Sequence, residues 1–241
     1  QAKKLSLNLS ADYLDNKAEP RNLLETYQRI TLSARLNKRW HTEAMDYNGS
    51  FNMDYGGSFD NDKADPQFNH GGTDRYKSKY NRYAASLSFS MGSNNEHLFF
   101  KSAELSASFS YERNRLERTK LVQLDGDTPA AMTMTNGESD AVLIAPYKYT
   151  ATHTVDGKPV SLYLKANASF SAPVRGLSNT LLLGVDYQMD RNLGEGQIFD
   201  RLHPVYTGAS YRPRRYADIP ASQMLAAYME ETLSKGIGNH K

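Results

Sequence analysis

A strict alternation of apolar and polar residues constrains this chain more than any other feature. In residues 5–13, LSLNLSADY, every odd position is apolar or aromatic and every even position is polar. Side chains along a β-strand point alternately to two faces, whereas a helix would scatter the same leucines around its axis. The segment is therefore predicted to be a strand with one apolar face and one wet face.

The alternation recurs in seven further segments, so the sequence predicts an all-β protein of antiparallel strands. The predicted strands cover residues 5–13, 28–40, 44–55, 80–91, 101–113, 160–171, 179–190 and 224–235, the last with an ambiguous phase. The residues expected to share the apolar face, which would be convex in a full barrel, include Leu7, Leu32, Phe51, Leu87, Phe109, Leu164 and Leu183. Those expected on the wet, concave face include Ser10, Ser33, Asn52, Ser88, Ser108, Asn167 and Asp186.

Such strands suit either a soluble sandwich with its apolar faces inside or a membrane barrel with its apolar face toward lipid. Predicted lengths of about 9–13 residues match a tilted membrane span better than the usual soluble strand of about 5–6. Aromatic residues end many strands on the apolar phase, where interfacial girdles lie. They are Tyr13, Trp40, Tyr55, Tyr83, Tyr111 and Tyr187. These features favour a transmembrane β-barrel over the soluble sandwich.

Composition excludes several other classes. Among the 241 residues no apolar run approaches the ~18 that a membrane helix needs, so a helical membrane protein is excluded. A net charge of +2 argues against a nucleic-acid binder, which usually carries a clustered basic face. The chain has no cysteine, which excludes disulfide scaffolds and cysteine metal sites.

The connections alternate between short and long, as strands of an outer-membrane barrel require. Short turns are expected at 41–43, 92–100, 172–178 and 236–241, and long loops at 14–27, 56–79, 114–159 and 191–223. Asp156-Gly157 is a hairpin signal. A membrane hairpin there would upset the alternation, so 147–163 is predicted to form an extramembrane hairpin within the large loop 114–159.

The turn at 41–43 joins two strands whose wet faces carry odd residue numbers before the turn and even residue numbers after it. Two residues that pair across the strands on the same face must therefore have residue numbers that sum to an odd value. A sum of 85 leaves a four-residue link and places Arg39 opposite Asp46 as a cross-strand ion pair. It also places Leu32 opposite Met53. A slip of one residue would turn charged side chains into lipid, at about 2–4 kcal/mol each.

One stretch resembles a recurring strand of TonB-dependent outer-membrane receptors. Residues 177–188, LSNTLLLGVDYQ, contain a turn, an apolar strand and a Gly-x-Asp-Tyr ending, and residues 226–233, AAYMEETL, resemble the strand that follows the next loop. Arg29 to Trp40, followed by Glu43 to Tyr55, also looks like mid-barrel strands of these receptors. The resemblance extends over essentially the whole chain and is most specific in 177–233.

The resemblance implies about eight membrane strands of a larger barrel, of the type with about 22 strands. In that family an N-terminal plug fills the barrel and contacts TonB, and nothing in 1–241 looks like a plug or like a closing aromatic strand. We therefore expect residues 1–241 to be an internal fragment of a barrel domain in the bacterial outer membrane. The implied partners are outer-membrane lipid, TonB through the plug region and, in the glycan- and peptide-importing branch, a surface lipoprotein.

No catalytic constellation stands out, so no enzyme and no cofactor are predicted. Asp60, Asp62 and Asp65 have the oxygen density of a calcium loop but lack the glycine and distal glutamate of that pattern, so a solvated loop is favoured. Tyrosines and arginines gather in the last long loop, and such residues are common binding anchors. This predicted ligand-binding cluster consists of Tyr206, Tyr211, Arg212, Arg214, Arg215 and Tyr216.

The predicted function is part of an energised importer, which captures a ligand outside and passes it through the barrel after the plug moves. One alternative is a passive porin-type channel whose selectivity comes from charges in the lumen. Another is a soluble β-domain that binds carbohydrate.

Overall fold

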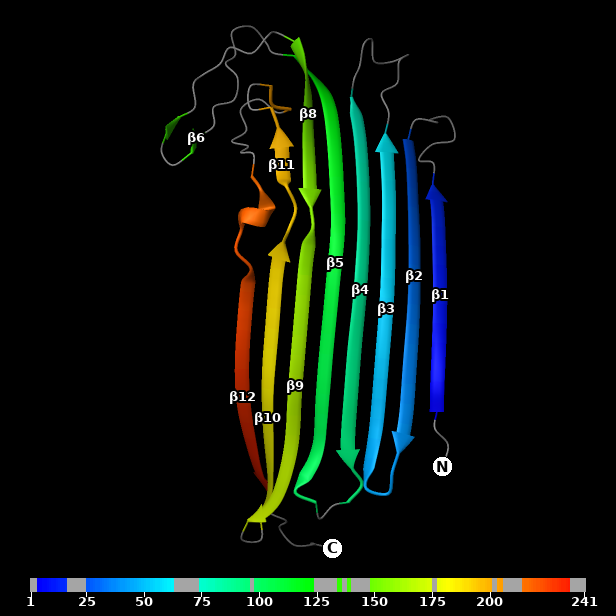
Figure 1. The fold of residues 1–241 in the computed structure, drawn as a ribbon, viewed down its shortest axis with the longest axis vertical. Coiled ribbons are helices and arrows are strands. Elements are labelled where there is room, and N and C mark those ends of the chain that lie inside the picture. Colours follow the sequence, from blue (N-terminus) through cyan, green and yellow to red (C-terminus); the bar gives the residue numbers. More distant parts are fainter. Residues whose placement is uncertain are drawn as a thin grey trace, which may run out of the picture.

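Eight long antiparallel strands lie side by side in the order of the sequence in the computed structural model (Figure 1). The structure describes residues 4–16, 25–62, 74–95, 98–123, 134–135, 138–139, 148–174, 177–200, 203–205 and 214–234. The elements are β1 (Lys4–Asn16), β2 (Glu25–His41), β3 (Met45–Asp62), β4 (Arg75–Ser93), β5 (Phe100–Gln123), β6 (Met134–Thr135), β7 (Glu138–Ser139), β8 (Lys148–Gly157), β9 (Pro159–Val174), β10 (Leu177–Asn192), β11 (Gly196–Phe199), the 3₁₀ helix η1 (Tyr216–Asp218) and β12 (Ser222–Ser234).

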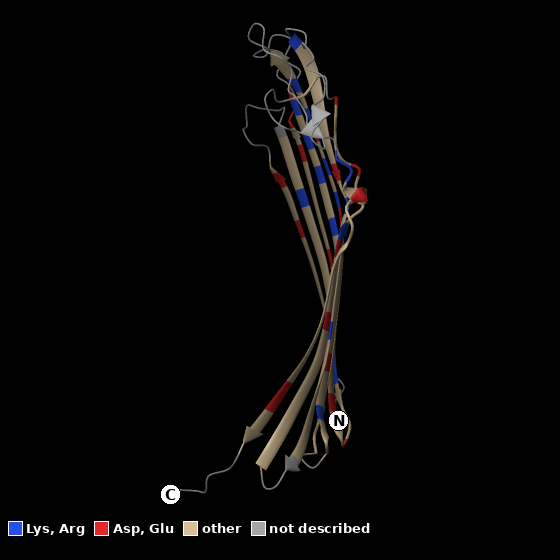
Figure 2. Cartoon of the chain, turned by 90° about the vertical axis from the view of Figure 1, so that its left-hand side faces the viewer, with Lys and Arg blue, Asp and Glu red and all other residues tan. Residues whose placement is uncertain are grey.

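The main sheet has the order β1-β2-β3-β4-β5-β9-β10-β12, so the prediction of an all-β, antiparallel chain with eight long strands is confirmed. Figure 2 shows this sheet nearly edge-on as one twisted, bowed layer. Within the described residues β1 pairs only with β2, and β12 only with β10, so the sheet is not closed. No helix in the described part of the chain is long and apolar enough to cross a membrane.

Pairing registers confirm the predicted division of residues between two faces, because directly opposed residues point to the same side. One apolar row across the sheet consists of Leu7, Leu36, Phe51, Leu87, Ala107, Leu164, Tyr187 and Leu225. The adjacent row on the other side consists of Asn8, Arg35, Asn52, Ser86, Ser108, Tyr163, Gln188 and Met224. The register also resolves the phase of β12, whose odd residues lie on the apolar face. Which face would be convex in a closed barrel stays a prediction.

Most strands continue beyond the predicted boundaries at the end where the long connections lie, which we call the loop end. There β3 extends to Asp62, β4 begins at Arg75 and β5 extends to Gln123. Alternation of apolar residues stops where the apolar band stops, but backbone pairing continues through polar residues. The described strand ends beside the connections 56–79, 114–159 and 191–223 lie at this same end of the sheet (Figure 1), as expected.

The predicted hairpin at Asp156-Gly157 is wrong. β8 ends at Gly157 and β9 begins at Pro159, and both strands pair antiparallel with β5. The chain therefore passes through this dipeptide without reversing direction. The reason lies in β5, whose 24 residues are long enough to pair first with β9 and then with β8. β11 then pairs with the outer side of β8.

The predicted parity of the β2–β3 hairpin is confirmed, but the predicted register is wrong by two residues. Partner numbers sum to 87, so Arg39 faces Asn48 and Leu32 faces Tyr55. Accordingly, the Nε of Arg39 donates to Asn48 Oδ1 at 3.4 Å, in place of the expected ion pair with Asp46.

The turn itself explains the shift. The Thr42 amide donates to the Met45 carbonyl at 2.8 Å, and the Met45 amide donates to Thr42 Oγ1 at 3.1 Å. Only Glu43 and Ala44 are left to reverse the chain, fewer than the four residues assumed.

Candidate binding surfaces

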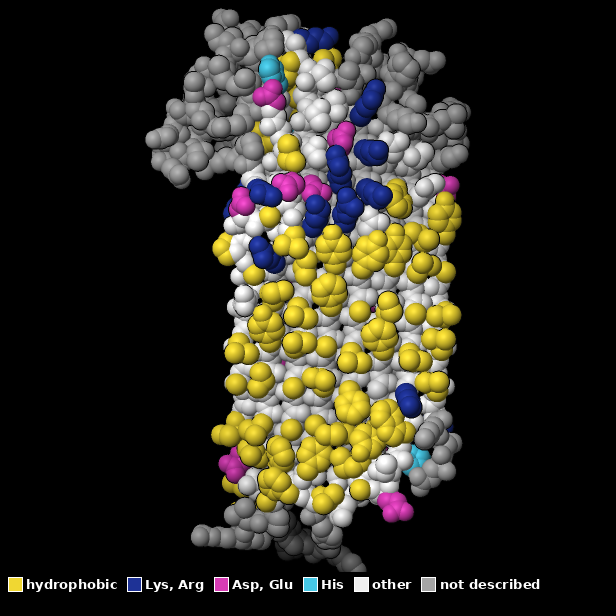
Figure 3. Space-filling view, in the orientation of Figure 1, with side chains coloured by type: hydrophobic (Ala, Val, Ile, Leu, Met, Phe, Trp, Pro, Cys, Tyr) yellow, Lys and Arg dark blue, Asp and Glu magenta, His cyan; other side chains and the backbone are white. Residues whose placement is uncertain are grey.

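The apolar face is exposed along the whole sheet. Its large side chains in the middle of the strands, such as Leu7 and Met53, are 60% and 54% exposed. In contrast, the buried apolar residues of the described chain are confined to a small cluster at the loop end, which consists of Val122, Tyr149, Ala151 and Val205. Figure 3 shows the uncovered band of hydrophobic side chains across the width of the sheet. The leucines therefore do not pack into a closed, dry core.

Two groups of aromatic rings border this band. Near the short turns, Trp40 stacks on Tyr47 with ring centroids 5.2 Å apart, and Phe89 lies 6.1 Å from Trp40. Toward the loop end, three tyrosines from adjacent strands form a row, with centroid distances of 5.1 and 6.3 Å. This tyrosine row consists of Tyr55, Tyr83 and Tyr111. Of the predicted aromatic strand ends, Trp40, Tyr55, Tyr83 and Tyr111 thus lie in these two groups, whereas Tyr13 pairs with Ile30 and Tyr187 lies in the middle of the band.

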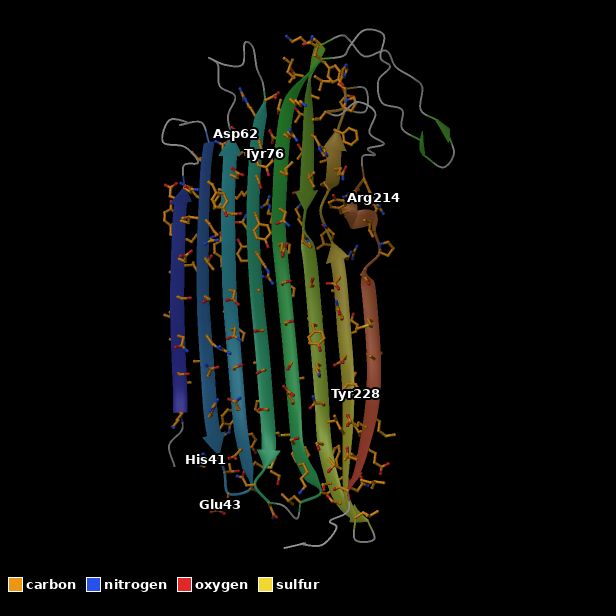
Figure 4. All side chains as sticks on the ribbon, turned by 180° about the vertical axis from the view of Figure 1, so that it is seen from behind. His41, Glu43, Asp62, Tyr76, Arg214 and Tyr228 are labelled. Atoms are coloured by element: carbon orange, nitrogen blue, oxygen red, sulfur yellow. The ribbon has the colours of Figure 1, made fainter. Side chains whose placement is uncertain are left out.

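The opposite face is lined by hydroxyl and amide groups that bind one another across strands (Figure 4). Ser10 and Ser33 lie 2.6 Å apart through their hydroxyl oxygens, and Ser50 and Ser88 lie 3.0 Å apart. Such short side chains leave their remaining donors and acceptors free for water or for a polar ligand. This face is chemically suited to line an aqueous passage.

A hollow of about 410 Å³ lies on the polar face, toward the loop end, between side chains from five neighbouring strands. Its polar lining includes Asp54, Arg82, Ser108, Tyr163, Gln188 and Asp190. The amide of Gln188 donates to Asp190 at 2.7 Å, and Arg82 forms an ion pair with Glu112 at 3.6 Å. Carboxylates, a guanidinium and hydroxyls together can hold a polar ligand by hydrogen bonds.

Sequence reasoning missed this hollow. Alternation had assigned Asp54, Arg82 and Asp190 to the wet face, but it did not bring them together. Only the pairing registers across β3, β4, β5, β9 and β10 place Asp54 and Asp190 in one row, with Arg82 in the next row of the same face.

The small cluster at the loop end is held by both apolar and polar contacts. The hydroxyl of Tyr149 donates to the Pro204 carbonyl at 2.8 Å, and its ring lies 5.1 Å from that of His203. Burial, and secondarily the charge of Asp200, raises the pKa of Tyr149. Burial, together with the charge of Arg118, lowers the pKa of His153, whose ring packs against Phe199. Both groups are therefore held neutral near pH 7.

The predicted Tyr/Arg cluster is described only in part, because Tyr206, Tyr211 and Arg212 lie outside the described residues. Arg214 pairs through its backbone with Gln197 (Figure 4), and Tyr216 begins η1. The guanidinium of Arg215 binds both carboxylate oxygens of Glu195, at 3.0 and 3.2 Å. These contacts bind the segment 214–216 to β11 and to Glu195, which directly precedes β11.

The acidic residues considered for calcium do not form a described metal site. Asp60 and Asp62 belong to β3 rather than to a loop, and they face Tyr27 and Glu25 of β2. Asp65 lies outside the described residues. In the part of the chain that the structure describes, no three acidic or histidine side chains are grouped as metal ligands.

Comparison with known proteins adds no relative. No family model matches the chain, and neither a curated protein nor a solved structure matches it. The geometry of the two faces and the sequence pattern of the strands therefore indicate the function.

Proposed function

We propose that this chain forms part of the wall of a transmembrane β-barrel in the bacterial outer membrane. The observation that carries the proposal is the uncovered apolar face of a single-layer sheet. Soluble monomers seldom expose a continuous apolar patch larger than a few hundred Å². A soluble sandwich would cover such a face with a second sheet, and the described residues contain no sheet that does so.

The dimensions of the apolar band support a membrane location. In β5, Ala103 lies in the row of Trp40 and Tyr47, and Tyr111 lies in the tyrosine row. These eight steps along the strand correspond to about 27 Å, or about 20 Å of height after a barrel strand's usual tilt of about 40°. The hydrophobic band of outer-membrane barrels is about 25 Å tall and is bordered by aromatic girdles. The spacing of the two aromatic lines thus fits one bilayer.

The two open edges of the sheet also bear on the proposal. In lipid, an unpaired strand edge would leave backbone N–H and C=O groups without partners, at several kcal/mol each. β1 and β12 have such edges in the described sheet. Within a membrane both edges would have to pair with other strands, as they would in a larger barrel.

Within this class we propose the barrel of a TonB-dependent receptor, which imports a ligand with energy from the inner membrane. Support comes from the resemblance of residues 177–188 and 226–233, which lie in β10 and β12 as neighbouring strands. The ring of Tyr228 lies over Gly184, at the start of the Gly-x-Asp-Tyr pattern. The polar face would line the passage, the long connections would capture the ligand, and no bond in the ligand would be broken.

The proposal includes partners by the same resemblance. TonB would act through a plug region of the full-length protein, and a surface lipoprotein would assist if the ligand were a glycan or a peptide. The first test is reconstitution of the full-length protein, refolded in detergent, into phosphatidylcholine vesicles. Resistance of the strands to protease and to alkaline extraction is expected, whereas solubility of the folded protein without detergent would overturn the membrane proposal.

A second test separates the importer from a passive channel. In planar bilayers the full-length protein should conduct little until its plug region is deleted, because the plug closes the barrel. Steady conductance by the intact protein would favour the porin-type channel instead. Bacterial growth that requires both a supplied ligand and TonB would then identify the class of ligand transported.

A further inference from the structure

A group of basic side chains lies on the apolar side of the sheet, immediately beyond the tyrosine row on the loop-end side. Figure 3 shows Lys and Arg gathered above the hydrophobic band there. We call these residues the basic row; they are Lys77, Lys79, Arg113, Arg115, Lys158 and Arg191. They come from β4, β5, β10 and the link between β8 and β9.

Strand register explains why these cations gather. Arg191 faces Val160, which faces Tyr111, so Arg191 extends the tyrosine row itself. Arg113 follows Tyr111 by two residues and therefore lies on the same side, one row higher. Lys79 faces Phe59 one row above that, with its ammonium 5.3 Å from the ring centre.

The charge of the basic row is only partly neutralised within the protein. Glu117 lies 3.8 Å from Arg115, and Asp156 lies 3.2 Å from Lys158. Among the described residues no ion pair engages the other four members of the row, which are Lys77, Lys79, Arg113 and Arg191. Those four side chains are exposed. Lys77 faces Glu117 across the strands, so the six cations of the row share two carboxylates, those of Glu117 and Asp156.

The orientation of Tyr55 matches the basic row. The hydroxyl of Tyr55 donates to Asn81 at 3.0 Å, and Asn81 lies in the row between the tyrosines and Lys79. The ring of Tyr55 therefore has its apolar body toward the band and its polar end toward the cations. Apolar side chains, phenols and then cations follow one another along the strands, in the order in which a lipid presents its tail, its interface and its headgroup.

We propose that the basic row binds the phosphate groups of anionic lipid headgroups in the leaflet at the loop end, an inference that rests on the proposed membrane location. Guanidinium groups bind phosphate oxygens in pairs, and ammonium groups bind them as point charges. The other end of the apolar face lacks such a row in the described residues: Lys38 of β2 lies over Trp40, and the charged residue on β12, at the far edge of the sheet, is the acidic Glu231. The chain would thus select one leaflet by charge.

The test measures lipid retained by the full-length protein after reconstitution into phosphatidylcholine vesicles that contain some phosphatidylglycerol. Native mass spectrometry should detect preferential retention of phosphatidylglycerol, which falls as salt is raised. The triple variant Lys79→Gln, Arg113→Gln, Arg191→Gln should lose about tenfold or more of this preference. Unchanged preference in the triple variant would overturn the inference.

A matched control removes the same number of charges from the polar face, through Arg35→Gln, Arg39→Gln and Lys165→Gln. This control variant should keep the wild-type preference for phosphatidylglycerol. An equal loss of preference in both variants would show that only net charge matters and would refute the basic row as a binding site. Inorganic phosphate at the lipid's concentration should not displace phosphatidylglycerol, since displacement would point to a free anion instead. Insertion without any lipid preference would refute this inference alone, whereas failure to insert into either vesicle would refute the membrane proposal with it.

Discussion

At the scale of single residues, Gly196 is the position where the backbone itself demands glycine. Its φ of +78° lies in the left-handed region, which costs other residues about 1–2 kcal/mol. A Cβ built there would also overlap the carbonyl oxygen of Arg214, which accepts the Gln197 amide at 2.9 Å. This close backbone approach is what joins the segment before η1 to β11.

The substitution Gly196→Ala should therefore destabilise the contact between β11 and the Arg214 backbone, lowering its free energy of local opening by about 1–3 kcal/mol. Hydrogen exchange at the Gln197 amide reports this directly, because that amide is bonded across the contact. Gly56→Ala serves as the control, since a Cβ there meets nothing within 4 Å. Equal protection of Gln197 in both variants would contradict the reading of Gly196.

Asp156 provides a prediction for pH. Burial alone would raise the pKa of its carboxyl group, but hydrogen bonds from the Glu195 amide and Lys158, with the charges of Lys158 and Arg113, hold the pKa below its ordinary value of 3.8. A carboxyl whose pKa is lowered on folding stabilises the fold above its unfolded pKa and loses that contribution as the pH falls through the folded pKa.

We therefore expect the contact between β8 and Glu195 to weaken below pH 3.8 and not between pH 5 and 7. Hydrogen exchange at the Glu195 amide, corrected for the intrinsic effect of pH, measures this loss. In Asp156→Asn the acid-induced change should disappear. A wild-type amide that stays equally protected down to pH 2 would refute the assignment.

At the scale of elements, the β2–β3 hairpin shows how a turn decides a register. Thr42 and Met45 close a two-residue turn, and the stack of Trp40 on Tyr47 holds the first pair of large side chains above it. The ring of Trp40 also covers Gly49: a Cβ built on Gly49 would lie 3.8 Å from the nearest atom of that ring. Parity restricted the register to odd sums, but the turn and the stack selected 87.

Cysteine pairs can test this register, because the chain has no cysteine of its own. Arg35→Cys with Asn52→Cys should form a disulfide readily, since these residues are direct partners. Arg35→Cys with Ser50→Cys should not, because a two-residue offset moves the Cα atoms about 8 Å apart, beyond the usual range for a disulfide. Faster cross-linking of the second pair under mild oxidant would favour the sum of 85.

At the scale of the whole molecule, the two faces of the sheet face different environments under the proposed function. Leu87 and Ser88 are neighbours in β4, yet Leu87 belongs to the exposed apolar row and Ser88 bonds to Ser50 on the polar face. A charge should therefore be costly at one position and tolerated at the next.

In lipid vesicles, Leu87→Arg should lower the free energy of unfolding by about 2–4 kcal/mol, as expected near the midplane of a bilayer. Ser88→Arg should cost less than about 1 kcal/mol, because its side chain would lie in the aqueous passage. Urea unfolding of the refolded, vesicle-bound protein compares the two variants. Equal costs at both positions would argue against a lipid-facing apolar side.

The sequence by itself determined the eight long strands and, in all of them but the last, the face on which each residue lies, because a period of two leaves a side chain no third choice. It did not determine how far the strands extend at the loop end, where polar residues pair without alternating. Nor did it predict that β5 would carry the chain straight through Asp156-Gly157. The register at 87, the hollow near Asp190 and the basic row arise from pairing between distant segments, so only the tertiary structure decided them.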